Sequence, residues 1–564
     1  MAEGGAITAP APRTYSNPRY PFVSCEELRR GQGHKPLVIV GAGLVGLTLA
    51  VDLATRGIPS VVLDDNDTVS VGSRAICFSQ RSLEILDRLG VAERLRAKGI
   101  TWNRGRVFFG EREIFGFDLQ PEAGYGWPAF INIQQYYVEQ WLVERAVETG
   151  LVDLRWRSRV SAVEQRPDCA LVRVETPEGG YELGCDWLVA CDGARSFVRD
   201  ALGLSFRGQV FQDRFLIADV WMKADFPTER WFWFDPPFNR GQSALLHRQA
   251  DDVWRIDLQL GWDADPELEK QPERVIPRLR AMLGPDRPFE LEWVSIYTFQ
   301  CRRLDRFVHG RVLFAGDSAH QVSPFGARGG NGGIQDADNL AWKLALVLQG
   351  HASADLLASY DEERVPAADE NILHSTRATD FITPKNAAAR AYRDAVLELS
   401  AGQPFARRWV NSGRLSRPAA LAASPLVTPC PDAEPLAPGA PLPDAPILVD
   451  GRSDWLLRQV GRGFELLVYG DPEKHGAAVR AAVAAAPLPL RPLFVQPPGG
   501  ASAGAAVDRD GIIARRCGLT DGACLLLRPD QHVAARWGTV DAAAVRTALL
   551  RGLASAREAT EAVR

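Results

Sequence analysis

A glycine-rich turn between an apolar strand and a helix constrains this chain more than any other feature. Residues 36–40 form a short apolar, β-branched run, and a GxGxxG pattern follows it at once. An apolar helix is expected from residue 44 to about residue 56, and a second strand over 60–63 ends at Asp64. A lone GxGxxG is weak, but one between a buried strand and a helix strongly indicates a dinucleotide-binding βαβ unit. The glycines are Gly41, Gly43 and Gly46.

The chemistry of such a unit predicts what its residues do. Glycines allow a tight turn, and the helix N-terminus offers unpaired N–H groups to a pyrophosphate. A carboxylate about 20 residues further on, here Asp64, can accept a ribose hydroxyl. The alternative is a glycine-rich turn without a ligand. We therefore expect an α/β fold that holds a nucleotide cofactor.

Composition excludes several other classes of protein. The 564 residues are 46% hydrophobic and 24% charged, with a formal net charge of −5. This is typical of a globular protein of several domains, and it gives no electrostatic reason to expect nucleic acid or a membrane as partner. The nine cysteines form no CxxC pair and no histidine cluster accompanies them, so no metal site is expected. Scattered thiols and the absence of an apolar leader favour the cytoplasm.

Changes in pattern along the chain divide it into five parts, one of which is discontinuous. A Trp-rich segment with alternating strand patterns interrupts the nucleotide-binding unit and predicts an antiparallel sheet with one buried face. Long helices, a Pro- and Ala-rich stretch and a last α/β pattern follow. The expected limits are 1–34 for an N-terminal arm, 35–205 and 300–400 for the nucleotide-binding domain, 206–299 for the inserted substrate domain, 401–446 for a linker and 447–564 for a C-terminal domain.

Two further motifs each follow an expected buried strand. The sequence DGARS occupies 192–196, GDSAH occupies 316–320, and a glycine-rich run over 326–333 opens a long helix. With the first motif, these resemble the class A flavoprotein aromatic monooxygenases, which are single-component FAD-dependent phenol, hydroxybenzoate and 3-(3-hydroxyphenyl)propionate hydroxylases. The resemblance covers roughly residues 35 to 400 and implies a Rossmann-like FAD-binding domain with an inserted substrate domain.

The resemblance assigns each motif to a part of FAD. The first holds the ADP half, the second is linked to FAD and to the pyridine nucleotide, and Asp317 holds the ribityl chain. A helix N-terminus stabilises the negative charge of reduced flavin, and glycines let the backbone approach the flat ring. The alternative for Asp317 is a carboxylate that caps its own loop. The expected FAD-binding residues are Gly41, Gly43, Gly46, Asp64, Arg74, Gln135, Asp192, Gly316, Asp317, Gly329, Gly330 and Asn331.

The implied activity is hydroxylation of an aromatic, phenolic substrate by O2 and NADH or NADPH, through a flavin C4a-hydroperoxide. A single Rossmann fingerprint is consistent with a pyridine nucleotide that binds only transiently. Two alternatives remain: a non-oxygenating FAD-dependent oxidoreductase, and a flavin-dependent halogenase. The halogenase is disfavoured because 231–234 reads WFWF and lacks the expected Gly-Trp-x-Trp-x-Ile-Pro pattern.

One position departs from the family pattern. Where the family commonly has Gly-Gly-Gln-Gly-Met-Asn, residues 326–331 read GARGGN. Arg328 would place a cation near the flavin edge or the substrate entrance, and the alternative is an outward salt bridge. His320 could line the flavin site or could equally be a loop histidine satisfied by backbone.

The substrate is expected between the inserted sheet and the flavin. His247 is the best candidate for drawing a phenolic proton, and Tyr297 and Arg328 complete the expected catalytic residues. Trp231, Trp233 and Arg255 are further lining candidates, and core packing is the alternative for each aromatic residue.

The last segment resembles the thioredoxin-like domain that some family members carry. Thioredoxin chemistry needs a CxxC pair, which Cys517 and Cys524 do not form, so no redox role is expected. We interpret this segment as structural and catalytically dispensable, and a homodimer through it is left open.

Overall fold

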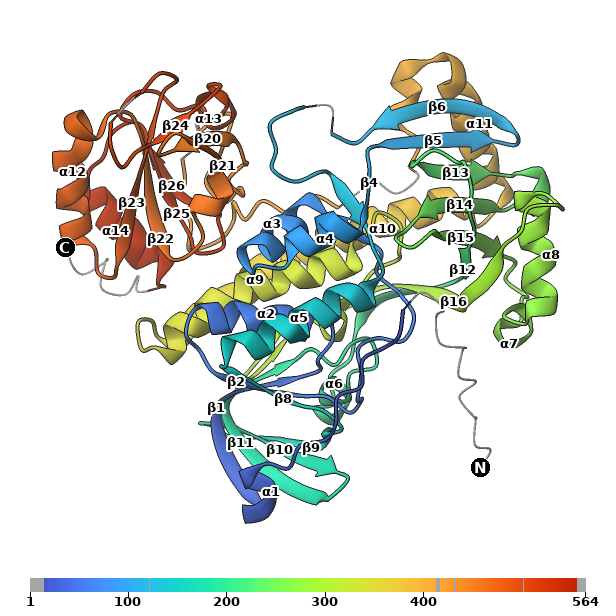
Figure 1. The fold of residues 1–564 in the computed structure, drawn as a ribbon, viewed down its shortest axis with the longest axis horizontal. Helices are drawn as coiled ribbons and strands as arrows, with labels where there is room; N and C mark the ends of the chain where they lie inside the picture. Colours follow the sequence, from blue (N-terminus) through green and yellow to red (C-terminus); the bar gives the residue numbers. More distant parts are fainter. Residues whose placement is uncertain (1–14, 121, 412–415, 431–432, 501, 555–564) are drawn as a thin grey trace.

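The computed structural model describes residues 15–554, except 121, 412–415, 431–432 and 501. The first fourteen residues of the expected arm and those short stretches lie outside the described residues. Three sheet-containing bodies surround a pair of long helices (Figure 1). The fold is therefore α/β, as predicted, with a Rossmann-like domain, an inserted antiparallel sheet and a C-terminal α/β domain.

A largely parallel sheet forms the first body. Its buried strands are apolar on both faces because helices cover them, as is usual for parallel sheets. β10 (Ala170–Thr176) and β9 (Arg159–Gln165) extend it through antiparallel pairing with β11. In spatial order the other strands are β17 (Val308–His309), β18 (Val312–Phe314), β11 (Gly179–Ala190), β1 (Gln32–Val40), β2 (Ser60–Leu63) and β8 (Val152–Arg155).

Helices connect these strands and carry the motifs. α2 (Leu44–Thr55) packs against α5 (Gln135–Thr149) and against α9 (Gly329–Leu348). The helices that open in the first motif and in the glycine-rich run after the third are therefore in contact. A three-stranded sheet adjoins them, with β7 (Phe130–Asn132) between β3 (Cys77–Ser79) and β4 (Ile100–Trp102). The shorter helices are α1 (Glu26–Arg30), α3 (Gln80–Arg88), α4 (Ala92–Lys98) and α6 (Phe197–Ala201).

The second body is the inserted sheet. All its neighbouring strands pair antiparallel except β13 with β5, which run parallel. In spatial order the strands are β19 (His320–Gln321), β16 (Glu290–Arg303), β12 (Arg207–Trp221), β15 (Val253–Leu260), β14 (Ser243–Arg248), β13 (Arg230–Phe234), β5 (Arg104–Phe109) and β6 (Arg112–Asp118).

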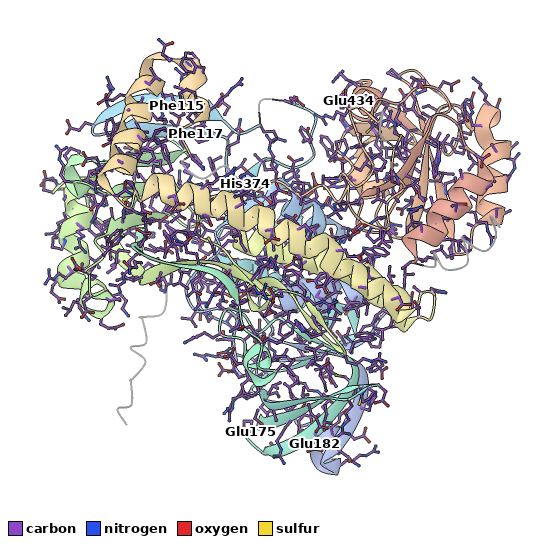
Figure 2. The ribbon with its side chains drawn as sticks, turned by 180° about the vertical axis from the view of Figure 1, so that it is seen from behind. Phe115, Phe117, Glu175, Glu182, His374 and Glu434 are labelled. Atoms are coloured by element: carbon purple, nitrogen blue, oxygen red, sulfur yellow. The ribbon has the colours of Figure 1, made fainter. Side chains whose placement is uncertain are left out.

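Both faces of this sheet are covered. One face packs on α8 (Pro272–Leu283), next to α7 (Pro266–Glu269), and the other packs on α10 (Ala358–Ile382) and α11 (Ala387–Gly402). Figure 2 shows Phe115 and Phe117 of β6 near α11, and Glu175 and Glu182 far away on the first sheet. The sequence did not indicate that β5 and β6, from inside 35–205, join this sheet.

The third body is a mixed sheet of the C-terminal segment, flanked by α12 (Pro472–Ala485), α13 (Ile512–Cys517) and α14 (Ala542–Gly552). Cys517 and Cys524 are buried there, and burial raises the pKa of each thiol to about 12. The strands in spatial order are β21 (Arg452–Trp455), β20 (Pro446–Val449), β24 (Ala506–Asp508), β23 (Leu490–Gln496), β22 (Phe464–Tyr469), β25 (Cys524–Leu527) and β26 (Val533–Trp537).

In the described ranges, no helix combines the length and apolar character that crossing a bilayer requires. In that same part of the chain, no three His, Cys, Asp or Glu side chains gather as metal ligands would.

Candidate cofactor and substrate site

The first and third motifs meet around one side chain, Val45 at the start of α2. Gly316 has a φ of 66°, and a Cβ added to it would lie 2.8 Å from Val45 Cγ2. A Cβ on Gly333 of α9 would lie 2.5 Å from the same atom. These close approaches require glycine, and they bring the first turn of α2, the Gly316–Asp317 loop and the first turn of α9 together.

The N-terminus of α2 keeps part of its donor capacity free. Asp64 Oδ2 accepts from the amide of Ala42 at 2.6 Å, and Glu139 Oε1 accepts from the amide of Leu44 at 3.1 Å. The amides of Val45 and Gly46 have no acceptor among the described residues. They therefore remain available to an anion at this helix end.

Glu139 is a residue of this site that the sequence did not single out. Its buried carboxylate also accepts from the amide of Ser70 at 2.8 Å and from Gln135 Nε2 at 2.8 Å. Gln135 Oε1 in turn accepts from the amide of Ala75 at 2.9 Å. Gln135 and Glu139 thus hold the 70–75 loop, which carries Arg74, against α5. A carboxylate on the buried face of an amphipathic helix was the available signal.

Asp317 lies in a group of charged and polar side chains. Burial raises the pKa of its carboxyl group, and the positive charges of His320 and Arg74 oppose this. Burial likewise raises the pKa of Tyr297, with a contribution from the negative charge of Asp317. Within the described ranges the Asp317 carboxylate accepts no hydrogen bond, so it can accept from ligand hydroxyls. Asp317, Arg74 and Tyr297 therefore converge on one region.

Asp336 of α9 fastens the Gly316–Asp317 loop to the helix. Its carboxylate accepts from the amide of Gly316 at 3.0 Å, from His320 Nε2 at 2.6 Å and from Arg364 Nε at 2.7 Å. The two cationic partners lower the pKa of Asp336 well below its usual range despite complete burial. His320 is therefore buried and paired with a carboxylate, which differs from the loop histidine satisfied by backbone.

The glycine-rich start of α9 is held in place by Asn331. Its Oδ1 accepts from the amide of Ser79 at 2.9 Å, and its Nδ2 donates to Cys77 O at 2.8 Å and to Ala327 O. The side chain thus joins α9 to β3. A contribution of Asn331 to FAD would come through its backbone, alongside Gly329 and Gly330.

The second motif caps the short helix α6 and contacts the first motif. Asp192 Oδ2 accepts from the amide of Val198 at 3.0 Å, and Ser196 caps α6 by accepting from the amide of Arg199. Asp192 Oδ1 is buried without a partner in the described part of the chain. An added Cβ on Gly41 would collide with Cys191 O, so the first and second motifs are also in direct contact.

Arg328 does not lie on the surface. It is 5% exposed, and its Nη1 donates to Asn371 Oδ1 of α10 at 2.9 Å. This position, just before α9, differs from the outward salt bridge that the sequence allowed.

The sheet places the expected substrate residues on two different faces. Trp231 and Trp233 pack with Leu246 and Trp254 on the α8 face. Tyr297 packs with the cluster on the opposite face. His247 and Arg255 are cross-strand partners. Each lies an odd number of positions from residues of its own strand that pack on the α8 face. Because side chains alternate along a strand, both lie on the opposite face, which carries Tyr297. Trp231 and Trp233 therefore do not line the region next to the motifs.

Arg255 links the sheet to the cofactor loop. Its Nε and Nη2 pair with the Asp219 carboxylate at 2.8 Å, and its guanidinium also donates to Ser73 O and to Arg74 O. His247, beside it, has its Nε2 3.6 Å from Asp257 Oδ2. Burial lowers the pKa of His247 to about 4, so the imidazole is neutral at pH 7.

The residues present fit FAD. The free amides of Val45 and Gly46 suit a pyrophosphate, and the unpartnered Asp317 carboxylate suits ribityl hydroxyls. The buried, unpartnered Asp192 Oδ1 provides a further acceptor. The Val45 contacts hold α2 against the Gly316–Asp317 loop, and the contact of Gly41 with Cys191 holds the Asp192 segment beside them.

Comparisons with known proteins agree with this fit. Residues 35–375 match the family described as FAD binding domain. A 3-(3-hydroxy-phenyl)propionate/3-hydroxycinnamic acid hydroxylase of Mycolicibacterium smegmatis is 29% identical over 379 residues, which are 67% of this chain and 66% of that relative. A 6-methylpretetramide 4-monooxygenase of Streptomyces rimosus is 33% identical over 391 residues, covering 66% of this chain and 67% of the relative.

A solved structure extends the likeness to the C-terminal domain. Aklavinone-11 hydroxylase in complex with FAD and aklavinone has a TM-score of 0.75 and 25% identity, and the match covers 93% of this chain and 99% of that one. The chain therefore belongs to the FAD binding domain family of FAD-dependent aromatic monooxygenases.

Proposed function

We propose that this protein hydroxylates an aromatic, phenolic compound with O2 and NADH or NADPH, using FAD bound at the meeting point of the three motifs. The observation that carries the proposal is the convergence of α2, the Gly316–Asp317 loop and α9 on Val45. The relative named as a 3-(3-hydroxy-phenyl)propionate/3-hydroxycinnamic acid hydroxylase supports the phenolic substrate class.

The chain's own residues supply binding, orientation and charge. The amides of Val45 and Gly46 bind the pyrophosphate, Asp64 takes a ribose hydroxyl, and Asp317 accepts from the ribityl chain. The first turn of α9 offers backbone N–H groups and its positive dipole end to negative charge. FAD, when bound, supplies hydride acceptance and oxygen activation. The sheet face that carries His247 and Tyr297 orients the aromatic ring, and its apolar cover limits water.

Three finer points belong to the same proposal. We assign the cofactor domain to 35–205 and 300–400, the substrate domain to 206–299, the linker to 401–446 and the last domain to 447–564. We place the protein in the cytoplasm and allow it to work as a homodimer. His247, Arg328 and Tyr297 remain the proposed catalytic residues.

The first prediction tests the cofactor site. Asp317→Ala should retain its fold, because the carboxylate makes no hydrogen bond to the described residues. The variant should bind FAD about 10-fold to 100-fold more weakly, since a charge-assisted hydrogen bond to the cofactor is lost. Flavin fluorescence titration of the apoprotein measures the dissociation constant. Asp305→Ala, at an exposed carboxylate just before β17, is the matched control. Unchanged FAD affinity of Asp317→Ala would overturn this placement of the ribityl chain.

The reaction class is tested with the holoenzyme. We expect the holoenzyme to oxidise NADH or NADPH with consumption of O2. A phenol should accelerate this oxidation, and a hydroxylated product should form. Oxidation of the nicotinamide without O2 uptake would identify a non-oxygenating oxidoreductase and contradict the proposal.

A further inference from the structure

A polar row crosses the inserted sheet on the face that carries Tyr297. Asp219 of β12 pairs in register with Arg255 of β15, and Arg255 pairs with His247 of β14. Trp231 of β13 pairs with Leu246, so Arg230, one residue earlier, lies beside His247. Four neighbouring strands thus present Arg230, His247, Arg255 and Asp219 side by side.

The two arginines of this row differ in their partners. Arg255 has its charge matched by Asp219 and its remaining donors directed at backbone carbonyls. Arg230 is only 8% exposed, yet it makes no hydrogen bond and no ion pair with any residue that the structure describes. Burial lowers the pKa of Arg230, against the opposing field of Asp257. A buried cation without a direct partner is costly, and such a group calls for a ligand.

Two further polar atoms near Arg230 are also unsatisfied. His247 Nδ1 and Asp257 Oδ1 are buried, and neither has a hydrogen-bond partner in the described ranges. Asp257 pairs in register with Leu245, in the next row of the sheet, where Phe232 is also found. The unsatisfied atoms therefore border an apolar surface, as expected of a site that holds a ring with one polar substituent.

This row faces the cofactor segments. Arg230, Arg255 and Asp257 all act electrostatically on the thiol of Cys77 on β3. The carbonyl of Cys77 accepts from Asn331 in the first turn of α9. Arg255 contacts the loop that carries Arg74. The row is thus connected on two sides to segments proposed to hold FAD.

The charges around Arg230 determine which ligand fits. His247 is neutral at pH 7 because burial, with the fields of Arg230 and Arg255, lowers its pKa. Asp219 is already paired with Arg255, whereas Asp257 makes only a 3.6 Å contact with His247. Arg230 therefore supplies the cation in this row that no direct pairing neutralises, and an oxyanion is its natural complement.

We propose that Arg230 anchors an anionic oxygen on the aromatic substrate, with His247 Nδ1 beside it as proton acceptor. This inference rests on the proposed function and names its substrate class: aromatic compounds with a phenolate or carboxylate oxygen. When the oxygen arrives as a phenol, its O–H bond breaks, the proton moves to His247 Nδ1, and the electron pair remains on the oxygen beside the guanidinium. No electrons are exchanged in this step.

The test measures binding to the holoenzyme with three chromophoric probes: 4-nitrophenol, 4-nitrobenzoate and the uncharged 4-nitroanisole. Arg230→Met should weaken binding of the anionic probes by about 10-fold to 100-fold and leave 4-nitroanisole unchanged. Wild-type holoenzyme should also favour the bound phenolate, seen as its absorption band at a pH where free 4-nitrophenol is partly protonated. Arg230→Lys should restore part of both effects, because it keeps the charge.

Two comparisons separate this role from a structural one. Arg248→Met changes the residue that follows His247 on β14. The Arg248 guanidinium pairs with Asp252 and lies over Trp254 of the α8 face. This variant should bind all three probes as wild type does. Arg230→Met should unfold at the same or a higher temperature than wild type, since it removes a buried cation that lacks a direct partner. FAD content and NADH oxidation without substrate should be unchanged in Arg248→Met.

The outcomes are distinct. If Arg230→Met binds both anionic probes more weakly, the site accepts phenolate and carboxylate oxygens alike. If it binds only one of them more weakly, the site is specific for that kind of oxygen. Any of three results overturns the inference. Arg230→Met binds the anionic probes as tightly as wild type does, wild type binds neither anionic probe, or Arg230→Met unfolds at a lower temperature than wild type. Failure of the proposed function would instead appear as absence of bound FAD or of O2-consuming NADH oxidation.

Discussion

At the scale of single residues, His247 shows how its surroundings fix the protonation state of a buried side chain. Its pKa is about 4 in the folded protein, against 6.5 for a free histidine side chain, and burial is the largest cause. Between these two values the unfolded chain binds more protons than the folded one. The free energy of unfolding therefore falls as the pH falls from about 6.5 towards 4.

This difference gives a prediction for His247→Asn, which cannot take up the proton. Lowering the pH from 7 to 5 should destabilise wild type by about 2 kcal/mol more than the variant. Urea unfolding at both pH values measures this difference. Equal losses in the two proteins would show that His247 has an ordinary pKa.

Some residues of the proposed site stand in motifs that can be seen in the sequence, and others have no sequence signal. Gly41, Gly316 and Asp317 stand in short motifs whose local geometry is nearly self-determined, so their positions follow from neighbours along the chain. Arg230 gave no sequence signal, because its meaning depends on which strands lie beside β13. Trp231 and Trp233 were expected near the substrate, but strand alternation does not tell which face of a doubly covered sheet meets the cofactor.

At the scale of secondary structure, α9 connects the cofactor site with the interior of the protein. Its first turn carries the glycines, and Asp336 in its second turn binds the amide of Gly316. Helices of this kind are predictable from periodicity. The parallel pairing of β5 with β13 was not, because it joins segments more than a hundred residues apart with no local signature.

Asp336→Asn tests this connection. The change leaves buried Arg364 and His320 facing a neutral amide, so it should cost about 3–5 kcal/mol of stability. It should also weaken FAD binding about 10-fold, because the Gly316–Asp317 loop loses its strongest acceptor. Denaturant unfolding and flavin titration measure the two effects. The control is Glu362→Gln, the same type of change at an exposed position of α10. Unaltered FAD affinity in Asp336→Asn would show that the loop holds its shape without the carboxylate.

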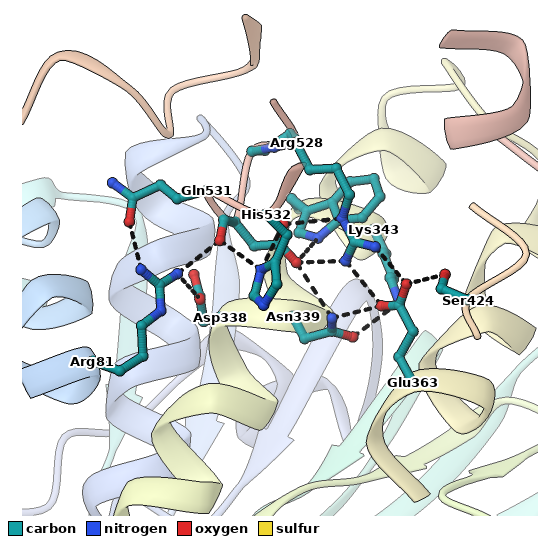
Figure 3. Close-up of polar contacts among 12 residues, drawn as sticks. Arg81, Asp338, Asn339, Lys343, Glu363, Ser424, Arg528, Gln531 and His532 are labelled. Atoms are coloured by element: carbon teal, nitrogen blue, oxygen red, sulfur yellow. Dashed lines mark hydrogen bonds and ion pairs between the residues drawn. The ribbon is translucent and has the colours of Figure 1, made fainter. Parts of the chain in front are cut away.

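At the scale of the whole molecule, a buried charge network joins the C-terminal domain to α9 and α10. Glu363 of α10 pairs with Arg528 at 2.5 Å and with Lys343 of α9 at 2.7 Å (Figure 3). Arg528 also pairs with Asp530, and Glu363 accepts from Ser424 of the expected linker. Trp342 of α9 lies in the apolar core of the C-terminal domain.

This interface changes the interpretation of the C-terminal domain. The sequence offered no acid, base or dithiol there, and we expected the domain to be dispensable for catalysis. The buried thiols agree with the absence of redox chemistry. Removing the domain would, however, expose Trp342 and leave Lys343 and Glu363 without Arg528 and Asp530. Because α9 also begins at the cofactor site, we now expect the domain to support that site through the helix.

A double-mutant cycle on Arg528 and Glu363 tests the network. Both side chains are fully buried, so Arg528→Met leaves the carboxylates of Glu363 and Asp530 without their shared guanidinium and should cost about 3–5 kcal/mol of stability. Glu363→Met leaves two buried cations with Asp530 and should cost a similar amount. The double variant restores the balance between Lys343 and Asp530, so its cost should fall short of the sum by more than about 1 kcal/mol. Urea unfolding of the four holoproteins gives the coupling energy. Additive losses would mean that the two charges act independently and that packing around Trp342, rather than the network, holds the domain in place.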